Sequence, residues 1–548
     1  MLFRSALTTT AFITLAHAYV WPNPQLDELE AIRFDQVGFN LLSTQLSTFV
    51  TPCTLFVFDT VAGGTTSGRS DAADWIRTVG FYLRRNLQRL IFWQAYHDMA
   101  TYNSTDQTGG LDASIRFAEE QARAENVGNG FANTANVVFA PVDRYVSMAD
   151  SIALAAIIAI ENCGGPEIAF RGGRLDAGEA NAPGVPQPQQ SLDSHIAAFA
   201  RQGFTQTEMI GLVACGHTFG GVQHAFFPTI VPALNDPNDT MDVTHFDSTY
   251  VTFDNNIAVE YIAGTTQDPL VAGANDTTNS DKRIFGSDGN QTMASFANSA
   301  ELFASTCADL YARMLDTVPA GVVLSDVITP LSVKPNIVDL VLDGDTIQLS
   351  GAVRLWNMTE DSSRTVIMVW TDHAGSTSTS ALTFAGVSSS TGGKYSAAWY
   401  WFNPTNPFGV LSLDAIAGVT SMSFVVDGTV EDQGGVGFAL QDAFMMSQTS
   451  CSSGAPLTGR IDVAVRNGVN PTRVYLESIT RDSVQRVVVT EIDLTPPTNP
   501  VVVNSAYVLW SMNLTDQSME FNLGAEIDGV KYSTTRVLSF LEFPECSD

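Results

Sequence analysis

Positive charge is scarce in this chain of 548 residues, which has 27 lysine and arginine residues against 58 aspartate and glutamate residues. The formal net charge at pH 7 is −31, and the pI is near 4.4. A protein with this excess of negative charge repels phosphate groups. The composition therefore argues against nucleic acid and against an anionic membrane surface as partners, and it fits an extracellular protein.

Long hydrophobic runs are also missing from the sequence. A membrane-spanning helix needs about 18 or more consecutive apolar residues, and we find no such run beyond the N-terminal region. The last four residues, ECSD, contain no hydrophobic anchor tail. We therefore expect neither a membrane span nor a lipid-linked anchor.

The N-terminal residues 1–18 have the pattern of a signal peptide. Arg4 is the basic flank, a short apolar run follows, and Ala16 and Ala18 provide a small-x-small cleavage site. We expect cleavage to leave Tyr19 as the first residue of a secreted protein. The alternative is a buried N-terminal helix.

Cysteine is sparse, with six residues in the whole chain. In an exported protein these suggest disulfides, although sequence alone does not fix the pairing. We expect Cys451 to pair with Cys546, since this bond would bracket the last segment, and we interpret Cys215 as a buried thiol. Six N-glycosylation sequons agree with secretion and lie at Asn103, Asn238, Asn275, Asn290, Asn357 and Asn513.

From about residue 27 to about residue 317 the pattern is mainly helical. Residues 150–160 start polar and then have no polar face, which predicts a central buried helix. Residues 299–314 place Leu302, Phe303, Leu310 and Met314 at helical spacing. Long loops rich in glycine, proline and asparagine separate the helices, for example at residues 172–190.

The sequence pattern changes near Pro330, and short β-rich runs separated by Gly, Asn, Ser and Asp follow. Met519, Phe521 and Leu523 alternate with polar residues, as in a half-buried strand. About ten such strands predict one or two β-sandwiches, with no clear internal repeat. Three further β-rich runs are residues 365–370, 487–490 and 501–503.

Two histidine motifs carry most of the functional information. Residues 95–100 read AYHDMA, with His97 at the centre, and residues 109–117 read GGLDASIRF. Residues 212–221 read LVACGHTFGG, with His217 at the centre. Each motif is ambiguous alone. Together, in this order and with acidic residues at fixed offsets, they could hold a haem between two imidazoles.

On these motifs the chain resembles the secreted haem peroxidases of the plant, fungal and bacterial superfamily, and most closely the fungal class. The resemblance covers roughly residues 25–320. It implies a mainly α haem-peroxidase fold over this range, followed by a β-sandwich-type C-terminal region. The expected domains are the signal peptide at 1–18, a peroxidase domain at 19–325 and a β-rich region at 331–548, which divides at 331–447 and 451–548 if two sandwiches form.

The resemblance assigns the distal side of the haem to His97, as the acid and base that moves a proton between the two peroxide oxygens. Tyr96 matches the aromatic residue that precedes this histidine. Asn126 matches the residue that accepts the other imidazole N–H and fixes the tautomer; a loop turn is the alternative for Asn126.

On the proximal side, the resemblance makes His217 the iron ligand. Asp288 matches the carboxylate that accepts its outer N–H and increases its electron donation. An N-cap role is the alternative for Asp288. Phe246 matches the aromatic residue packed against the proximal imidazole. By position in the family pattern, Cys53 pairs with Cys163.

Two calcium sites are also implied, since clustered carboxylate, hydroxyl and carbonyl oxygens are the ligands that calcium prefers. Each site adjoins one of the two histidine motifs; the alternative is a pair of solvated acidic turns. The distal ligands are Asp98, the Gly110 carbonyl, Asp112 and Ser114. The proximal ligands are Thr218, Asp247, Thr249, the Thr252 carbonyl and Asp254.

The pattern is interrupted where the family has an arginine, one helical turn before the distal histidine. Trp93 occupies this position. Removal of residues 79–94 would join Thr78 to Ala95 and place Arg77 four residues before His97. Every valine codon begins with GT and glutamine can be encoded by CAG, so the coding sequence of this segment could begin and end like an intron. The segment is also basic in an otherwise acidic chain. We therefore interpret it as translated intron.

Two specialised donor sites of the family have no full match. A manganese site would use three carboxylates, but the matching positions hold Ser70, Asp74 and Gln223. The position of a surface tryptophan in lignin-oxidising relatives holds Leu212.

The sequence therefore predicts a monomeric extracellular peroxidase with haem b and two calcium ions, which reduces hydrogen peroxide and oxidises phenols or other small aromatic donors. Tyr96 and Trp75 are candidates for radical carriers, with core aromatics as the alternative. A degenerate haem-binding or cell-wall protein is the second functional hypothesis. In that case residues 399–402, WYWF, could stack on a polysaccharide, or they could be a buried strand.

Overall fold

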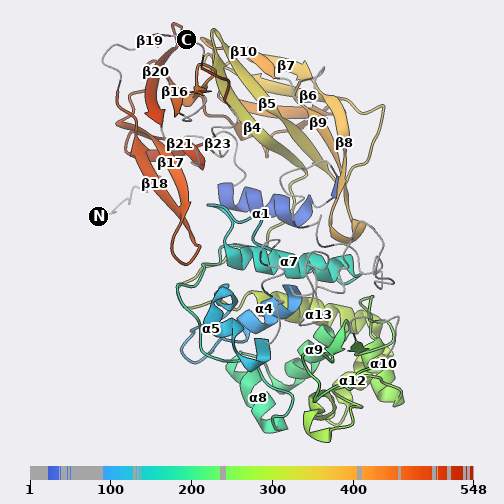
Figure 1. Cartoon of the computed structure of the whole chain (residues 1–548). Helices are drawn as coiled ribbons and strands as arrows, with labels where there is room; N and C mark the ends of the chain where they lie inside the picture. The colour runs from blue at the N-terminus through green and yellow to red at the C-terminus, as the bar shows by residue number, and fades with distance from the viewer. Residues whose placement is uncertain are drawn as a thin grey trace, which may run out of the picture.

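The computed structural model describes residues 23–35, 37–38, 46, 50, 91–126, 131, 135, 138–234, 242–403, 410–453, 458–496, 501–502, 504–514, 520–534, 538–539 and 543–546. Among them, helices dominate up to residue 315 and strands dominate from residue 333 onward (Figure 1). The predicted helical first part and β-rich second part are confirmed at this level. The predictions for the signal peptide, Cys53, Ser70, Asp74, Trp75 and Arg77 lie outside the described residues.

The predicted central helix is α7 (Met148–Asn162), whose residues 148–161 are all buried. Ser147 caps it by accepting a hydrogen bond from the Asp150 N–H at 3.0 Å. The second predicted helix is α13 (Ala300–Leu315), in which Phe303, Leu310 and Met314 are buried. Leu302 also lies in this helix, but on its outer face, with its side chain 44% exposed. The loop at 172–190 is confirmed as irregular.

The other helices build the rest of the helical part around α7. They are α1 (Pro24–Phe34), α4 (Ile91–Met99), α5 (Ala118–Gln121), α8 (Leu192–Arg201), α9 (Gln206–His217), α10 (Asn256–Ala263), α11 (Ser280–Phe285) and α12 (Gln291–Asn298), with 3-10 turns η2 (Ser114–Arg116), η3 (Ala124–Asn126) and η4 (Asp276–Thr278). A two-stranded ribbon pairs β2 (Gly221–Gln223) with β3 (Val243–His245).

The described strands of the β-rich part lie in three sheets. The largest has eleven strands in the order β1-β8-β9-β5-β4-β14-β16-β20-β19, with β10 beside β5 and β15 beside β16. The two others have five strands each, in the orders β12-β11-β6-β7 with β13, and β18-β17-β21-β22 with β23. Within the described ranges, the twenty strands β4 to β23 exceed the predicted number of about ten, because many are short.

The strands of the large sheet are β1 (Val37–Gly38), β8 (Thr383–Ser389), β9 (Ser396–Trp401), β5 (Thr346–Trp356), β4 (Val333–Asp343), β10 (Leu411–Asp414), β14 (Phe444–Ser447), β15 (Cys451–Ser453), β16 (Thr458–Arg466), β20 (Tyr507–Leu514) and β19 (Val501–Val502). The smaller sheets contain β6 (Val366–Thr371), β7 (Thr377–Ala381), β11 (Ser421–Val426), β12 (Thr429–Glu431) and β13 (Phe438–Ala439), and then β17 (Arg473–Arg481), β18 (Val487–Asp493), β21 (Glu520–Ile527), β22 (Val530–Ser533) and β23 (Leu538–Ser539).

Each smaller sheet packs on a different stretch of the large sheet, so two hydrophobic cores form. Leu349 and Val353 of β5 share one core with Phe424 of β11. Val463 of β16 shares the other with Leu476 of β17. The predicted division at 331–447 and 451–548 stays a prediction about domains.

Strand β14 connects the two cores. It pairs in parallel with β4 and antiparallel with β16. Successive side chains of a strand point to opposite faces. Accordingly, Met445 belongs to the first core, and Phe444 and Met446 belong to the second. We therefore expect a substitution in β14 to disturb the packing of both cores.

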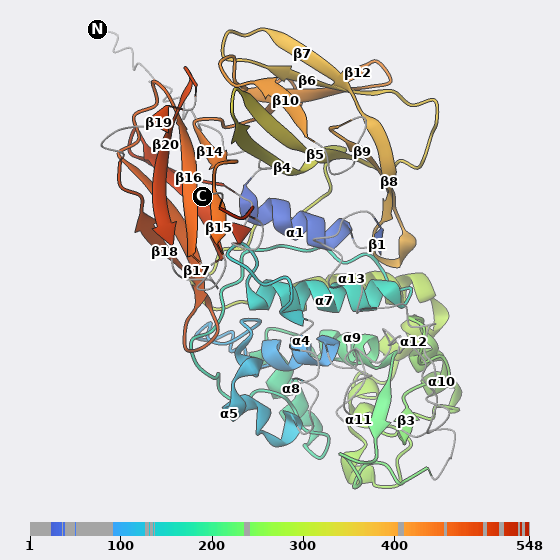
Figure 2. The ribbon, with the colours of Figure 1, turned by 45° about the horizontal axis from the view of Figure 1, so that its top comes forward.

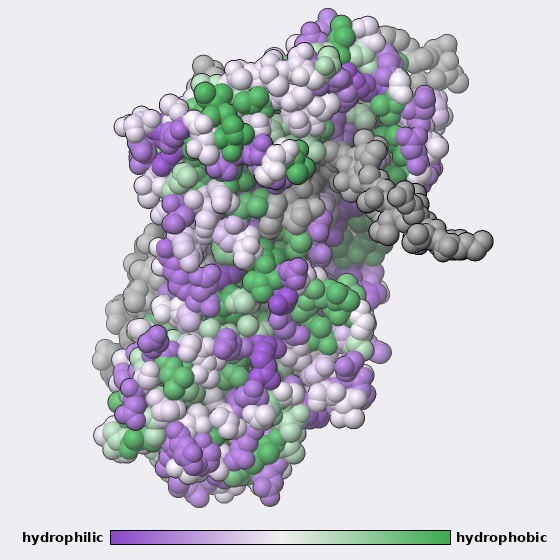
Figure 3. Space-filling view, turned by 180° about the vertical axis from the view of Figure 1, so that it is seen from behind, coloured by the Kyte–Doolittle hydropathy of each residue, from purple (hydrophilic) through white to green (hydrophobic). Residues whose placement is uncertain are grey.

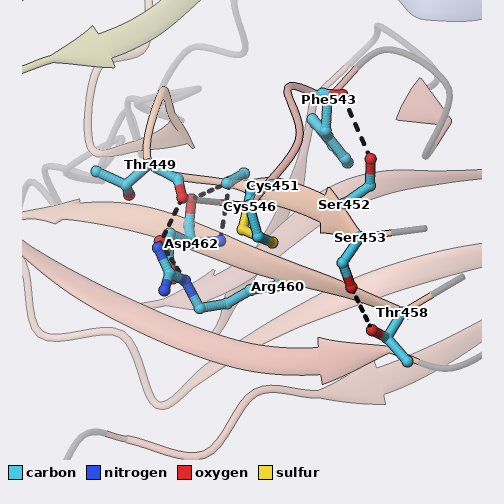
Figure 4. Close-up of a disulfide and its surroundings, with 10 residues drawn as sticks. Thr449, Cys451, Ser452, Ser453, Thr458, Arg460, Asp462, Phe543 and Cys546 are labelled. Carbon is cyan, nitrogen blue, oxygen red and sulfur yellow. Dashed lines mark hydrogen bonds and ion pairs between the residues drawn. A yellow bond between two sulfur atoms is a disulfide. The ribbon is translucent and has the colours of Figure 1, made fainter. Parts of the chain in front are cut away.

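The predicted bond between Cys451 and Cys546 is confirmed. Figure 4 shows it beside the contact of Ser452 Oγ with the Phe543 carbonyl at 3.4 Å. The expectation of a free thiol at Cys215 is wrong, since Cys215 forms a buried disulfide with Cys307 that joins α9 to α13. Cys163 is also disulfide-bonded, while its predicted partner Cys53 lies outside the described residues.

Three of the four aromatic side chains at 399–402 are buried, and Tyr400 and Phe402 belong to the first β core. Trp399 is 0% exposed, Tyr400 is 2% and Phe402 is 0%. The indole N–H of Trp399 donates to Ser388 Oγ at 2.8 Å inside the sheet. These three side chains are therefore not available for stacking on a sugar, and the buried-strand alternative is correct for them.

Helix α1 lies between the two parts of the molecule, with α7 on one side and strands β4 and β5 on the other (Figures 1 and 2). Its N-cap Asn23 and the proline at its first position favour a helix start here. Toward α7, Arg33 donates to both carboxylate oxygens of Glu161, at 2.6 and 3.1 Å. Toward the strands, Glu30 binds Arg354 Nη2 at 2.5 Å and Lys334 Nζ at 2.7 Å.

This network is enclosed. Glu30, Asp35 and Arg354 are 0% exposed, and Lys334 is 1% exposed. Arg354 also binds Asp35 Oδ2 at 2.8 Å. Buried charges are tolerated when they are paired and hydrogen-bonded, and the loss of one partner leaves the others without compensation. The two parts of the chain are thus joined by an ion network rather than by a loose linker.

The first prediction concerns Arg354. We expect Arg354→Met to lower the free energy of unfolding by about 3–5 kcal/mol, because it leaves Glu30 and Asp35 buried without their main cation. Urea denaturation of the purified full chain measures this. Lys531→Met is the control, since Lys531 is 55% exposed in its pair with Glu491 and such pairs contribute about 0–1 kcal/mol. Equal effects of the two substitutions would contradict the prediction.

The second prediction concerns pH. Burial, followed by the nearby Asp143 carboxylate, raises the pKa of Glu28 from its ordinary 4.5 to about 7. Burial raises the pKa of Asp35 to about 6, against the opposing effect of Arg354. Because the folded chain keeps these protons to higher pH than the unfolded chain, their contribution to stability is fully present below about pH 4 and is lost as the pH rises toward 7.

We therefore expect these two groups to lower the melting temperature of the full chain as the pH rises from 4.5 to 7. Glu28→Gln should reduce this fall, since glutamine has no proton to lose. Glu119→Gln is the matched control, because Glu119 is exposed. An unchanged pH profile in Glu28→Gln would show that Glu28 does not contribute.

The surface in Figure 3 shows small apolar groups interspersed with polar ones over the face seen from behind. Among the described residues, no helix combines the length and the apolar character that a membrane crossing requires.

Candidate active site

Two histidines from different helices line one cavity in the helical part. His97 comes from α4 and His217 is the last residue of α9. The walls between them are mainly apolar and include Val185, Leu212 and Ile284. The other lining residues are Tyr96, Ala124, Glu125, Pro186, Gln187, Pro188, His195, Phe199, Val213, Gly216, Gly221, Val222, Phe227, Phe246, Leu270, Ser280 and Asp281.

His97 is oriented by Asn126, as the sequence predicts. The Nδ1 and Asn126 Oδ1 atoms are 2.7 Å apart, and Asn126 Nδ2 donates to the Glu120 carbonyl at 2.7 Å. The second bond fixes the amide, so that its oxygen faces the imidazole and His97 Nδ1 is the donor. The lone pair of the neutral ring is then on Nε2. Burial lowers the pKa of His97 to about 3, which keeps the ring neutral near pH 7.

His217 is positioned by the end of a well-defined helix. Thr205 and Glu208 form a capping box at the start of α9. The imidazole stacks on Phe246, with ring centroids 4.1 Å apart and an angle of 8°. Its Nδ1–H donates to Asp281 Oδ2 at 2.5 Å. The predicted role of Phe246 as packing partner is therefore found in the geometry.

The predicted partner Asp288 is wrong, because Asp281 takes that position. Asp288 instead accepts the N–H groups of Gln291 and Thr292 at 3.0 and 2.9 Å and caps the start of α12. A Ser-Asp pair stands at 280–281 and again seven residues later at 287–288. The residues three and four positions after Asp281 are Ile284 and Phe285, both buried. This apolar face is the signal that distinguishes the buried carboxylate from the capping one.

Tyr96 lies in the cavity wall and stacks on Phe199 at a centroid distance of 6.2 Å. Its pKa is raised by burial. Leu212 and Gln223 are 4% exposed, so neither presents a surface to a bulky donor or to an external cation.

The four residues of the predicted distal calcium site are next to one another, directly after His97. Asp98 Oδ1 accepts the Ser114 hydroxyl at 3.2 Å, and Asp98 Oδ2 accepts the Asp112 N–H at 2.9 Å. Asn181 Nδ2 donates to both oxygens of Asp112, at 3.0 and 2.9 Å. Burial, followed by Asp112, raises the pKa of Asp98 well above its usual range. Gly110 is in the same loop and buried.

The predicted proximal calcium residues also lie together, around the end of α9. Thr218 Oγ1 donates to the Asp254 carbonyl at 2.5 Å, and Thr249 Oγ1 donates to Asp254 Oδ1 at 3.0 Å. Asp247 Oδ1 accepts the Thr249 N–H at 3.0 Å. The Thr252 N–H donates to the Thr249 carbonyl at 2.8 Å.

The predicted arginine site is only partly described. Helix α4 begins at Ile91 and continues without a break through Ala95, so the last residues of the 79–94 segment form its first turn. Trp93 is in this turn, four residues before His97, and Arg77 lies outside the described residues.

Comparison with known proteins points in the same direction as the geometry. Residues 69–303 match the family model described as peroxidase. The chain is 36% identical to a WSC domain-containing protein of Arthroderma benhamiae over 364 residues, which are 65% of this chain and 46% of the relative.

Named peroxidases match over shorter stretches. The chain is 32% identical to the peroxisomal L-ascorbate peroxidase 5 of Arabidopsis thaliana over 33% of this chain and 60% of the relative. It is 31% identical to the mitochondrial cytochrome c peroxidase of Yarrowia lipolytica over 23% of this chain and 38% of the relative. The chain thus spans about half the length of the curated relatives that it matches.

Proposed function

Because the helical part of this chain belongs to the plant, fungal and bacterial peroxidase superfamily, we propose that the protein is an extracellular haem peroxidase that reduces hydrogen peroxide and oxidises phenolic or other small aromatic donors. One observation carries the proposal. His97 and His217 line the same apolar cavity, and each has its Nδ1 held by a side-chain oxygen, from Asn126 and Asp281.

The residues fit a haem. The cavity walls are apolar, as a porphyrin face requires. With Nδ1 of His217 donating to Asp281, its Nε2 is the nitrogen that can bind iron, and the carboxylate increases the basicity of that ligand. Tyr96 and Phe246 are two of the aromatic residues that line this pocket. A bound haem supplies an iron that binds peroxide and takes up its oxidising equivalents.

The residues of this chain then move the proton. His97 Nε2 accepts a proton from the inner peroxide oxygen, because burial and Asn126 keep the ring neutral with its lone pair on that atom. The same nitrogen returns the proton to the outer oxygen as the bond between the oxygens breaks. An arginine at the position of Trp93 would stabilise the charge on the departing oxygen.

Haem loading of the purified full chain tests the proposal. We expect Soret absorption and peroxide-dependent oxidation of a phenol. Because named relatives are an ascorbate peroxidase and a cytochrome c peroxidase, ascorbate and reduced cytochrome c belong in the donor panel. Haem binding without turnover of any donor would favour the second hypothesis of a haem-binding protein without catalysis.

Calcium binding is part of the proposal. Asp98 and Asp112 are buried side by side, and a divalent cation among their oxygens would remove the repulsion between them. A ligand present at a hundredfold excess over its Kd stabilises the folded state by about 2.7 kcal/mol.

Calcium removal gives the third prediction. We expect EGTA to lower the melting temperature, and Asp112→Asn to reduce this response. Asp106→Asn, an exposed position in the same loop, is the control and should respond like the unsubstituted chain. A melting temperature that does not respond to EGTA would contradict calcium binding.

We also propose secretion, supported by the signal-peptide pattern at residues 1–18 and by disulfides that include Cys215–Cys307 and Cys451–Cys546. The sequon residues Asn275, Asn290, Asn357 and Asn513 are exposed. N-terminal sequencing of protein from culture medium should begin at Tyr19. Retention of residues 1–18 on the protein would contradict this proposal.

A further inference from the structure

A second carboxyl group lies behind the pair formed by His217 and Asp281. Asp268 follows α10, and its side chain is 0% exposed. One atom each of His217, Asp268 and Asp281 lie within 4.8 Å of one another. Asp281 is itself 1% exposed. Two acidic side chains are therefore in close approach inside the protein, next to the histidine that faces the cavity.

The hydrogen bonds show which of the two is the carboxylate. Asp281 accepts the His217 N–H on Oδ2 at 2.5 Å and the Ser280 hydroxyl on Oδ1 at 3.0 Å. Among the described residues, the Asp268 side chain accepts only the Leu270 N–H, on Oδ1 at 2.8 Å, and its buried Oδ2 accepts no donor. Two of these three donors are on Asp281, so it is the better stabilised carboxylate, and Oδ2 of Asp268 is the atom available to carry a proton.

Electrostatics agrees with this assignment. Two buried carboxyl groups in contact do not both ionise, and one of them keeps its proton. Burial, followed by the Asp281 charge, raises the pKa of Asp268 well above its usual range. The other groups that act most on Asp268 are the Leu270 N–H and the Asp247 carboxylate, and none of these is a cation.

A bound metal ion explains the close approach of His217, Asp268 and Asp281 less well than a shared proton does. A metal bound there would need the lone pair of His217 Nδ1. With Asp281 as the carboxylate, the 2.5 Å hydrogen bond instead places a hydrogen on that nitrogen.

We propose that Asp268 is a positioning residue, a neutral carboxylic acid whose O–H donates to Asp281 and so weakens that carboxylate as the acceptor of the His217 Nδ1–H. The role extends the proposed peroxidase function, on which it rests for its consequence at the iron. A weaker acceptor leaves more of the proton on His217 and makes the imidazole a poorer electron donor. The ferric state is then less stabilised, and the reduction potential is higher than Asp281 alone would set.

Asp268→Asn gives the sharpest test, because the asparagine amide also donates a hydrogen bond but has no proton to lose. In the haem-loaded full chain we expect the Fe(III)/Fe(II) potential to stay near that of the unsubstituted protein. Asp268→Leu, which removes the donor, should shift the potential to more negative values. Asp288→Asn is the matched control, since Asp288 caps α12 and does not line the cavity.

Two results would overturn the proposal. If Asp268 were ionised, Asp268→Asn would introduce a new donor and move the potential to clearly more positive values. If Asp268 had only a packing role, Asp268→Leu would leave the potential unchanged, or both variants would shift it equally.

A measurement on the haem-free full chain separates this proposal from the proposed function. With histidine labelled by ¹⁵N, the Nδ1–H proton resonance of His217 reports the strength of its bond to Asp281. We expect little change in Asp268→Asn. A large upfield shift there would refute the role of Asp268 even in a chain that binds no haem, whereas failure to load haem with an unchanged resonance would refute only the peroxidase function.

Discussion

A His97→Gln variant is expected to react with hydrogen peroxide about 10²–10⁴-fold more slowly than the unsubstituted protein, the usual contribution of a general acid and base. The reason lies in the geometry of His97. Asn126 Oδ1 fixes the Nδ1–H at 2.7 Å, and burial lowers the pKa of the ring to about 3. The Nε2 lone pair is thus available at all pH values well above 3.

Stopped-flow absorbance of the haem-loaded proteins measures this rate. His373→Gln is the matched control, because His373 also binds a carboxylate, Asp442, at 2.9 Å, but lies in the β-rich part. Soret absorption should be retained in both variants, since neither position is the proposed iron ligand. A rate for His97→Gln equal to that of the control would exclude His97 as the base.

Deletion of residues 79–94 is expected to have the second large effect, an increase of about 10²–10³-fold in peroxide turnover, the contribution of one charge-stabilising donor. The deletion joins Thr78 to Ala95 and moves Arg77 to the place of Trp93, four residues before His97. Residues four apart share a helix face. In a continuous helix the segment would instead rotate Arg77 by about 160° and displace it by about 24 Å.

Two controls make this experiment specific. Deletion of residues 79–94 together with Arg77→Leu should lose the gain, because the shorter chain then lacks the cation. Sequencing of the transcript across the codons for Thr78 and Ala95 tests the origin of the segment. Correctly processed RNA that contains the whole segment would refute the intron interpretation, and equal turnover of both protein forms would refute its mechanistic consequence.

Features set by local sequence were the predictable part of the fold. Helix α7 could be predicted because residues 150–160 have no polar face, and α13 because Ser299 precedes a run with helical spacing. The disulfide between Cys215 and Cys307 could not be predicted, since it depends on the packing of α9 against α13 across 92 residues of sequence. The interface of α1 escaped prediction for the same reason.

Prediction of the site residues from the sequence was limited in the same way. His97, Asn126, His217 and Phe246 were found by their motifs, and the structure brings each pair together. Asp281 was missed because Asp288 has the same local pattern, a serine-aspartate pair next to a helix. The dipeptide alone does not distinguish them; the apolar residues Ile284 and Phe285 after Asp281 do, because they bury α11 and bring Asp281 to the cavity.

The position of α1 has a consequence for how the chain is made. Glu30 binds Lys334 and Arg354 across 304 and 324 residues of sequence. At about 5–20 residues per second, a ribosome needs roughly fifteen seconds to one minute to reach these partners after α1 has emerged. During that interval Glu30 and Asp35 have no cation from β4 or β5 and remain hydrated. The two parts of the protein therefore finish folding together, and a chain that ends before residue 334 would expose acidic side chains that the complete protein encloses.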